Sequence, residues 1–127
     1  MAHLKVANWN LQRSSPLHRR LSQIESDLSF NDTGIWFLTE THEDIEPNEG
    51  FYACYSGTQD RSVKERERRV GIWSKWPVER LDSYALDSAR CAVGRIVDSL
   101  FGEVILFGTV LPWTNEWRGA RRSRWFW

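Results

Sequence analysis

Short apolar runs alternate with polar segments along the chain, and the first two such runs each stop at a polar side chain. Residues 4–9 form a short run that ends before Asn10, and residues 35–38 form a continuous run that follows Gly34 and leads to Glu40. The first run predicts a buried strand. The second predicts a central strand that is buried on both faces.

A helix is predicted between these two strands. Ser15 followed by Pro16 is a typical helix start, because serine accepts hydrogen bonds from the first turn and proline has no N–H to satisfy. Leucine and isoleucine then recur at spacings of four, three and four residues, which gives one apolar face. The helix is therefore expected to begin at Leu17 and end at Leu28.

A strand–helix–strand order predicts a crossover to a parallel neighbouring strand. The carboxyl ends of both strands then meet at one edge of the sheet, which is where α/β proteins bind ligands. Asn10 and Glu40 would both lie at that edge. The alternatives are that Asn10 only closes a turn and that Glu40 is an exposed acid in an acidic loop.

The later apolar runs predict four more strands, at residues 51–56, 70–74, 89–97 and 104–110. The polar segment 57–69 is expected to be an exposed loop, although its arginines would also suit the steering of phosphate-bearing substrates. Pro77 prevents the strand at 70–74 from continuing. Residues 98–102 are expected to form a hairpin loop.

Charge is balanced overall but uneven along the chain. Lys+Arg and Asp+Glu both number 17, so net charge indicates neither a nucleic acid nor a membrane partner. Residues 40–49 carry five acids and no base, whereas residues 118–124 carry four arginines and no acid. Several of the eight tryptophans lie inside apolar runs and are expected to be core residues.

The two cysteines, Cys54 and Cys91, are far apart and form no CxxC motif, so neither a disulfide framework nor a cysteine metal site is expected. No apolar run approaches the roughly 20 residues that a bilayer span needs. The N-terminus does not resemble a signal peptide. A cytoplasmic protein of one domain without a membrane span is therefore expected.

Four segments together resemble the endonuclease/exonuclease/phosphatase superfamily, which has the DNase I-like fold. Residues 6–10 form a strand that ends in asparagine, and residues 35–41 form a strand that carries a glutamate. Residues 70–77 contain a glycine, a β-run, a serine and a proline, and residues 104–112 resemble the strand that leads to the central cleft. The order and spacing of the segments carry the resemblance.

The resemblance implies an α/β (α+β) fold, namely the N-terminal half of a DNase I-like four-layer α/β sandwich, with a mixed β-sheet and a helix at residues 17–28. It implies a partial domain at residues 1–112 and leaves an irregular arginine- and tryptophan-rich tail at residues 113–127. It also implies Mg²⁺-dependent hydrolysis of phosphodiesters or phosphomonoesters, with Mn²⁺ as an alternative metal.

The same resemblance gives roles to two residues as the catalytic set. Glu40 matches the metal-binding glutamate, and Asn10 matches the asparagine that orients metal-site and phosphate groups. Mg²⁺ suits this pair, because it is often held by one or two carboxylates together with waters and substrate phosphate. His42 follows closely and would contact the phosphate or a metal ligand, but an exposed loop histidine is the favoured interpretation.

The sequence lacks the family's second-half motifs, glycine–aspartate–x–asparagine and serine–aspartate–histidine. A truncated chain with little or no hydrolase activity is therefore expected, and its substrate would be a phosphate ester, with nucleic acid among the candidates. The alternative is a non-catalytic remnant or binding protein. It would use the basic, aromatic tail, or it would self-associate through an uncovered sheet face. The favoured interpretation of the tail is a segment foreign to the fold, from truncation or a shifted reading frame.

Overall fold

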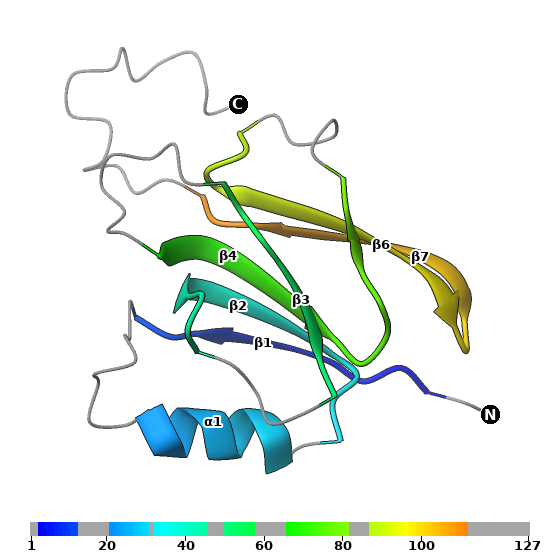
Figure 1. Ribbon diagram of the computed structural model, residues 1–127, viewed down its shortest axis with the longest axis horizontal. Coiled ribbons are helices and arrows are strands. Elements are labelled where there is room, and N and C mark those ends of the chain that lie inside the picture. The colour runs from blue at the N-terminus through cyan, green and yellow to red at the C-terminus, as the bar shows by residue number, and fades with distance from the viewer. Residues whose placement is uncertain are drawn as a thin grey trace.

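The computed structural model describes residues 3–12, 21–30, 32–45, 50–57, 66–81 and 87–111. There it contains two sheets and one helix, α1 at Leu21–Phe30 (Figure 1). The first sheet has the order β1-β2-β4-β3, with bounds Val6–Asn10, Ile35–His42, Glu67–Ser74 and Tyr52–Tyr55. The second sheet has the order β5-β6-β7, with bounds Glu79–Arg80, Cys91–Ser99 and Gly102–Thr109. The first sheet lies between α1 and the second sheet (Figure 1).

Strands β1 and β2 are parallel, as the strand–helix–strand order predicts, and their register runs from Val6↔Ile35 to Asn10↔Thr39. β2 is central and largely buried, which confirms the expectation from its continuous apolar run. The expectation of a buried β1 is wrong. β1 is an edge strand among the described residues, and exposed and half-buried positions alternate along it, with Val6 51% exposed.

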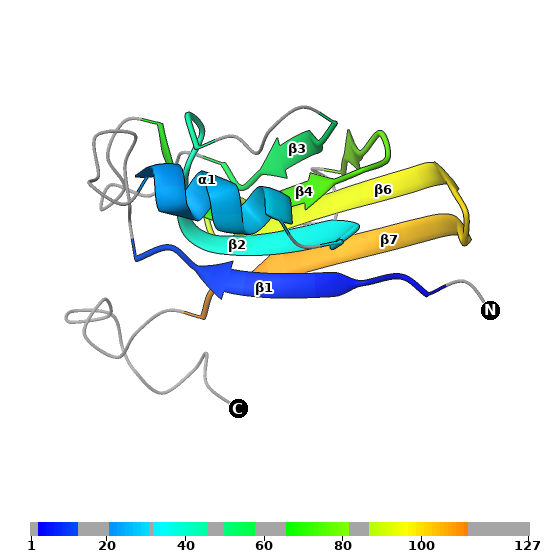
Figure 2. The same ribbon diagram turned by 90° about the horizontal axis from the view of Figure 1, so that it is seen from below.

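Helix α1 covers the face of the first sheet that points away from the second sheet (Figure 2). Its buried residues Ile24 and Leu28 pack with Trp36, Leu38 and Trp73 of β2 and β4 in one core cluster. The helix ends at Phe30, just past Leu28, the last apolar position of the predicted face. Residues 13–20, which include the predicted helix start, lie outside the described residues.

The opposite face of the first sheet packs against the second sheet. Ile35, Val70 and Ile72 from the first sheet form a core cluster with Ile96 and Leu106 from the second. Glycine permits this close contact at residue 108, where a Cβ atom would lie 2.8 Å from Cγ1 of Val70 and 3.0 Å from Cδ1 of Phe37. Interior packing leaves little room for an added methyl group, so the two sheets depend on this glycine.

Some strands begin or end at other residues than predicted, because they pair with neighbouring strands. β4 begins at Glu67, inside the predicted loop 57–69, because its first residues pair with the end of β2 through Thr41↔Arg68 and His42↔Glu67. β5 was not predicted and has only two residues. The β6–β7 hairpin is confirmed, with a turn at Leu100 and Phe101.

One prediction concerns residues that the structure does not describe. The tail at residues 113–127 lies beyond the described residues, so the predicted domain boundary remains a prediction. Within the described ranges, no helix has the length and apolar character needed to cross a membrane.

Candidate active-site edge

The parallel pairing of β1 and β2 brings Asn10 and Glu40 to the same edge of the first sheet. Asn10 is in register with Thr39, the residue before Glu40, and the N–H of Leu11 donates to the Thr39 carbonyl oxygen at 2.9 Å. The carboxyl ends of both strands point the same way (Figure 1). The two candidate residues are therefore neighbours across adjacent strands, at the edge where the sequence places a site.

Asn10 is exposed and closes a turn. Its side-chain Oδ1 accepts a hydrogen bond from the N–H of Gln12 at 2.8 Å, and Gln12 has a φ of 53°. Its Nδ2 donors have no partner among the described residues. Asn10 therefore closes a turn through its Oδ1, as the alternative interpretation of this residue expects. Its Nδ2 remains available to donate to a ligand.

Glu40 has a φ of 51°, a left-handed backbone conformation inside a strand. Residues other than glycine adopt this conformation seldom, at a cost of about 1–3 kcal/mol. The ladder pairs Thr39 with Val70 and Thr41 with Arg68 but omits Glu40. The regular alternation of side chains is interrupted here, and such strain concentrates at functional sites.

The acidic run after β2 is partly neutralised by two arginines that β4 and its preceding residue supply. Arg66 donates to the Asp44 carboxylate through Nε at 3.1 Å and through a second, closer contact. Arg68 forms an ion pair with Glu43 in which both side chains are largely buried. Glu40 has no ion-pair partner in the described part of the chain. Of the three described acids at this edge, Glu40 is the one left to bind a cation.

His42 is a correction to the expected exposed loop histidine. It ends β2 with 9% of its surface exposed, because β2 continues past its apolar run and pairs His42 with Glu67. Its Nδ1 accepts a hydrogen bond from the N–H of Asp44 at 3.1 Å.

Arg69 was missed by sequence reasoning, which assigned it to the exposed loop. It is 3% exposed and lies on β4 between Arg68 and Val70, whose partners Thr41 and Thr39 flank Glu40. A buried arginine is rare in proteins. The extra length of β4 places it there, and no local apolar pattern signals that length.

The donor atoms at this edge suit one side of a Mg²⁺ site. Among the described residues, no group of three or more histidine, cysteine, aspartate or glutamate side chains is arranged to hold a metal. Mg²⁺ does not need such a group, since one or two carboxylates, waters and a substrate phosphate often suffice. Glu40 supplies one carboxylate and Asn10 one amide, so the fit to Mg²⁺ is partial.

No protein-family model matches the sequence, and no curated protein matches it. Among solved structures, the chain is similar to the endonuclease domain of TRAS1, a telomere-specific non-LTR retrotransposon. The TM-score is 0.60 at 18% sequence identity, and the match covers 86% of this chain but 46% of that chain. The chain therefore spans less than half of that structure, and its fold is a partial DNase I-like fold, as its sequence pattern predicts.

Proposed function

We propose that this chain carries one wall of the active site of a Mg²⁺-dependent phosphoesterase, with Mn²⁺ as the alternative metal and a nucleic acid as the favoured substrate. The observation that supports it best is Glu40, which combines a left-handed backbone, a place at the carboxyl end of β2 beside Asn10, and no ion-pair partner among the described residues. Nucleic acid is favoured because the structurally similar domain of TRAS1 is an endonuclease domain.

In this proposal Glu40 binds the metal through its carboxylate, and Asn10 donates Nδ2–H to a phosphate oxygen. When bound, the metal polarises the phosphoryl group and stabilises the leaving oxygen. The turn that holds the Asn10 Oδ1 reduces the entropy that its side chain loses on binding. Asp44 and Glu43 do not compete for the metal, because each is already paired with an arginine.

The same proposal predicts weak or absent hydrolysis by this chain alone. A phosphoesterase also needs a group that activates water, and neither second-half motif that would supply it occurs in the sequence. His42 is not a substitute base in this proposal, since its Nδ1 is occupied by the Asp44 N–H. The chain would bind metal and phosphate ester without efficient turnover.

Metal binding by Glu40 is testable without an activity assay. Free Mn²⁺ measured by electron paramagnetic resonance gives its affinity for the 127-residue chain. Glu40→Gln should weaken Mn²⁺ binding about tenfold or more, because it removes the one carboxylate ligand. Glu103→Gln is the matched control, since Glu103 is an exposed acid on β7. Equal affinities in both variants would reject the metal site, and rapid Mg²⁺-dependent cleavage by the wild-type chain would reject the expected lack of turnover.

A second candidate is a non-catalytic binding protein that associates with itself or a partner. The observation that favours it is the outer face of the second sheet, where Ile105 and Phe107 of β7 are 55% and 54% exposed and Val97 of β6 is 51% exposed. Clustered exposed apolar side chains mark interaction sites. The tail-based form of this alternative and the cytoplasmic location remain predictions.

A further inference from the structure

The second sheet has one long open edge among the described residues, and β7 forms it. β7 pairs with β6 on one side and with no described strand on the other. It has eight residues and runs along the outside of β6 (Figure 2), whereas β5, at the other edge of the sheet, has two. A long edge strand exposes N–H and C=O groups that can pair with a further strand.

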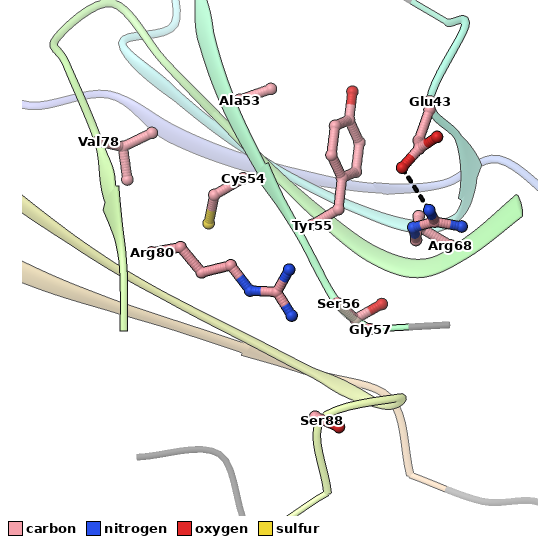
Figure 3. A pocket seen from close by; sticks show the side chains of 10 residues that line it. All are labelled: Glu43, Ala53, Cys54, Tyr55, Ser56, Gly57, Arg68, Val78, Arg80 and Ser88. Atoms are coloured by element: carbon pink, nitrogen blue, oxygen red, sulfur yellow. Dashed lines mark hydrogen bonds and ion pairs between the residues drawn. The ribbon is translucent and has the colours of Figure 1, made fainter. Parts of the chain in front are cut away.

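Side chains occupy the space beside β5. A pocket of about 630 Å³ lies there, between β3 and β5. The Arg80 side chain extends into it between Cys54 and Ser88 (Figure 3). Arg68 and Glu43 form an ion pair at its rim. The edge at β5 is therefore short and obstructed, so β7 is the edge of the second sheet that suits an added strand.

The backbone groups of β7 point alternately toward β6 and toward the open edge. The carbonyl oxygen of Val93 on β6 accepts from the N–H of Leu81 at 2.9 Å, on the side of β5, so it points away from β7. Val93 is in register with Phe107, whose N–H and C=O groups therefore point away from β6. By the same alternation those of Ile105 point to the open edge, and those of Leu106 point to β6.

The exposed side chains of β7 form a stripe that is complementary to itself. Ile105 and Phe107 are 55% and 54% exposed, and Glu103 and Thr109 on either side of them are also exposed. All four share one face, because successive side chains alternate across a strand. Along β7 the stripe runs acid, apolar, apolar, hydroxyl. A second β7 in the opposite direction therefore places each apolar residue beside an apolar one and each acid beside a hydroxyl.

We propose that β7 pairs in antiparallel orientation with β7 of a second copy of this chain, about a two-fold axis at Leu106. Ile105 then lies opposite Phe107 of the second copy. Glu103 lies opposite Thr109 of the second copy, and the symmetry repeats both pairs. A shift of two residues would place Glu103 opposite Phe107 in one direction and opposite a residue beyond the end of β7 in the other. The side chains therefore select one register.

The pairing rests on the second candidate function, for which it names the partner and the strand, and it requires neither Glu40 nor a metal. It joins the two second sheets into one continuous sheet, through backbone groups at the edge of β7 in addition to its apolar side chains. An interface of this kind is closed, because the same strand of each copy is used up by the other. A dimer is therefore expected rather than a fibre.

The charge at residue 109 tests the register. Thr109→Glu would place like charges opposite each other twice, so sedimentation equilibrium should show the dissociation constant of the dimer rise about fivefold. Adding Glu103→Lys to that variant makes both pairs attractive and should restore at least the wild-type affinity. Thr109→Gln is the matched neutral control. Because both positions are exposed, urea denaturation should find every variant folded.

Amide hydrogen exchange followed by nuclear magnetic resonance gives a second readout. Exchange at Ile105 and Phe107 should slow about tenfold at protein concentrations where the dimer forms, whereas Leu106 should be protected at every concentration. Unchanged exchange at Ile105 and Phe107 in a dimer would mean that association uses the outer face alone, and would overturn the edge pairing. Wild-type affinity in Thr109→Glu, or a chain that is monomeric at every concentration, would also overturn it. Glu40→Gln should leave the dimer intact, so failure of the metal site and failure of the dimer are separate results.

Discussion

The two sheets differ in how their faces are covered. Buried apolar side chains stabilise the fold, whereas exposed ones can bind a partner. The first sheet has α1 on one face and the second sheet on the other, so Leu38 and Ile72 of its central strands are fully buried. Among the described residues, the second sheet packs against the first through one face, and Ile105 and Phe107 on its other face are more than half exposed. Apolar side chains therefore stabilise the chain in the first sheet, whereas on the outer face of the second they remain available to a partner.

The strongest test of this difference compares two aromatic residues. Trp73→Ala should lower the free energy of unfolding by about 3–5 kcal/mol, because Trp73 is fully buried under α1 and its loss leaves a cavity. Phe107→Ala should change it by about 0.5 kcal/mol or less, as expected for a surface site. Urea denaturation followed by circular dichroism measures both. Similar losses in the two variants would mean that the outer face of the second sheet is also core.

A second test concerns the contact between the sheets. Gly108→Ala should lower the free energy of unfolding by about 1–3 kcal/mol, because the new methyl group would overlap Val70 and Phe37. Thr109→Ala, at the exposed next position, is the control and should have little effect. An unaltered urea midpoint in Gly108→Ala would show that the two sheets are not in close contact there.

A third test addresses the strain at Glu40. Glu40→Gly should raise the free energy of unfolding by about 0.5–1 kcal/mol, because glycine adopts a positive φ without steric cost. The same change should remove Mn²⁺ binding. Thr39→Gly, in the regular part of β2, should instead lower stability by about 1 kcal/mol. If both glycine variants lose stability equally, Glu40 carries no backbone strain.

The fourth test combines the smallest expected change in the free energy of unfolding with a large expected change in self-association of the chain. Phe107→Lys should reduce self-association, because it places a charge in the exposed apolar patch of the second sheet. Its effect on the free energy of unfolding should stay within about 0.5 kcal/mol. Sedimentation velocity at several protein concentrations gives the oligomeric state, with Glu103→Lys as the control. A wild-type chain that stays monomeric at every concentration would contradict this role for the patch.

Local patterns predicted those parts of the fold that depend on neighbouring residues in sequence. The apolar periodicity gave the helix face at Ile24 and Leu28, and the continuous run at residues 35–38 gave the central strand. The edge position of β1 and the early start of β4 depend on pairing with distant strands, which composition does not encode.

The candidate site likewise has features that the sequence predicts and features that it does not. The polar ends of two apolar runs pointed to Asn10 and Glu40, because parallel strands end at one edge. The left-handed backbone at Glu40 and the burial of His42 and Arg69 arise from contacts between separate segments. Glutamate rarely adopts a positive φ, so no sequence pattern predicts this backbone conformation.

The close contact at Gly108 also bears on how the molecule moves. Two sheets in such close contact at Gly108 resist sliding past each other there, because the side chains of one would have to move over those of the other. Glu40 on the first sheet and Phe107 on the second, next to Gly108, are then held at a fixed distance from each other. A partner that contacts both residues must therefore match this fixed distance.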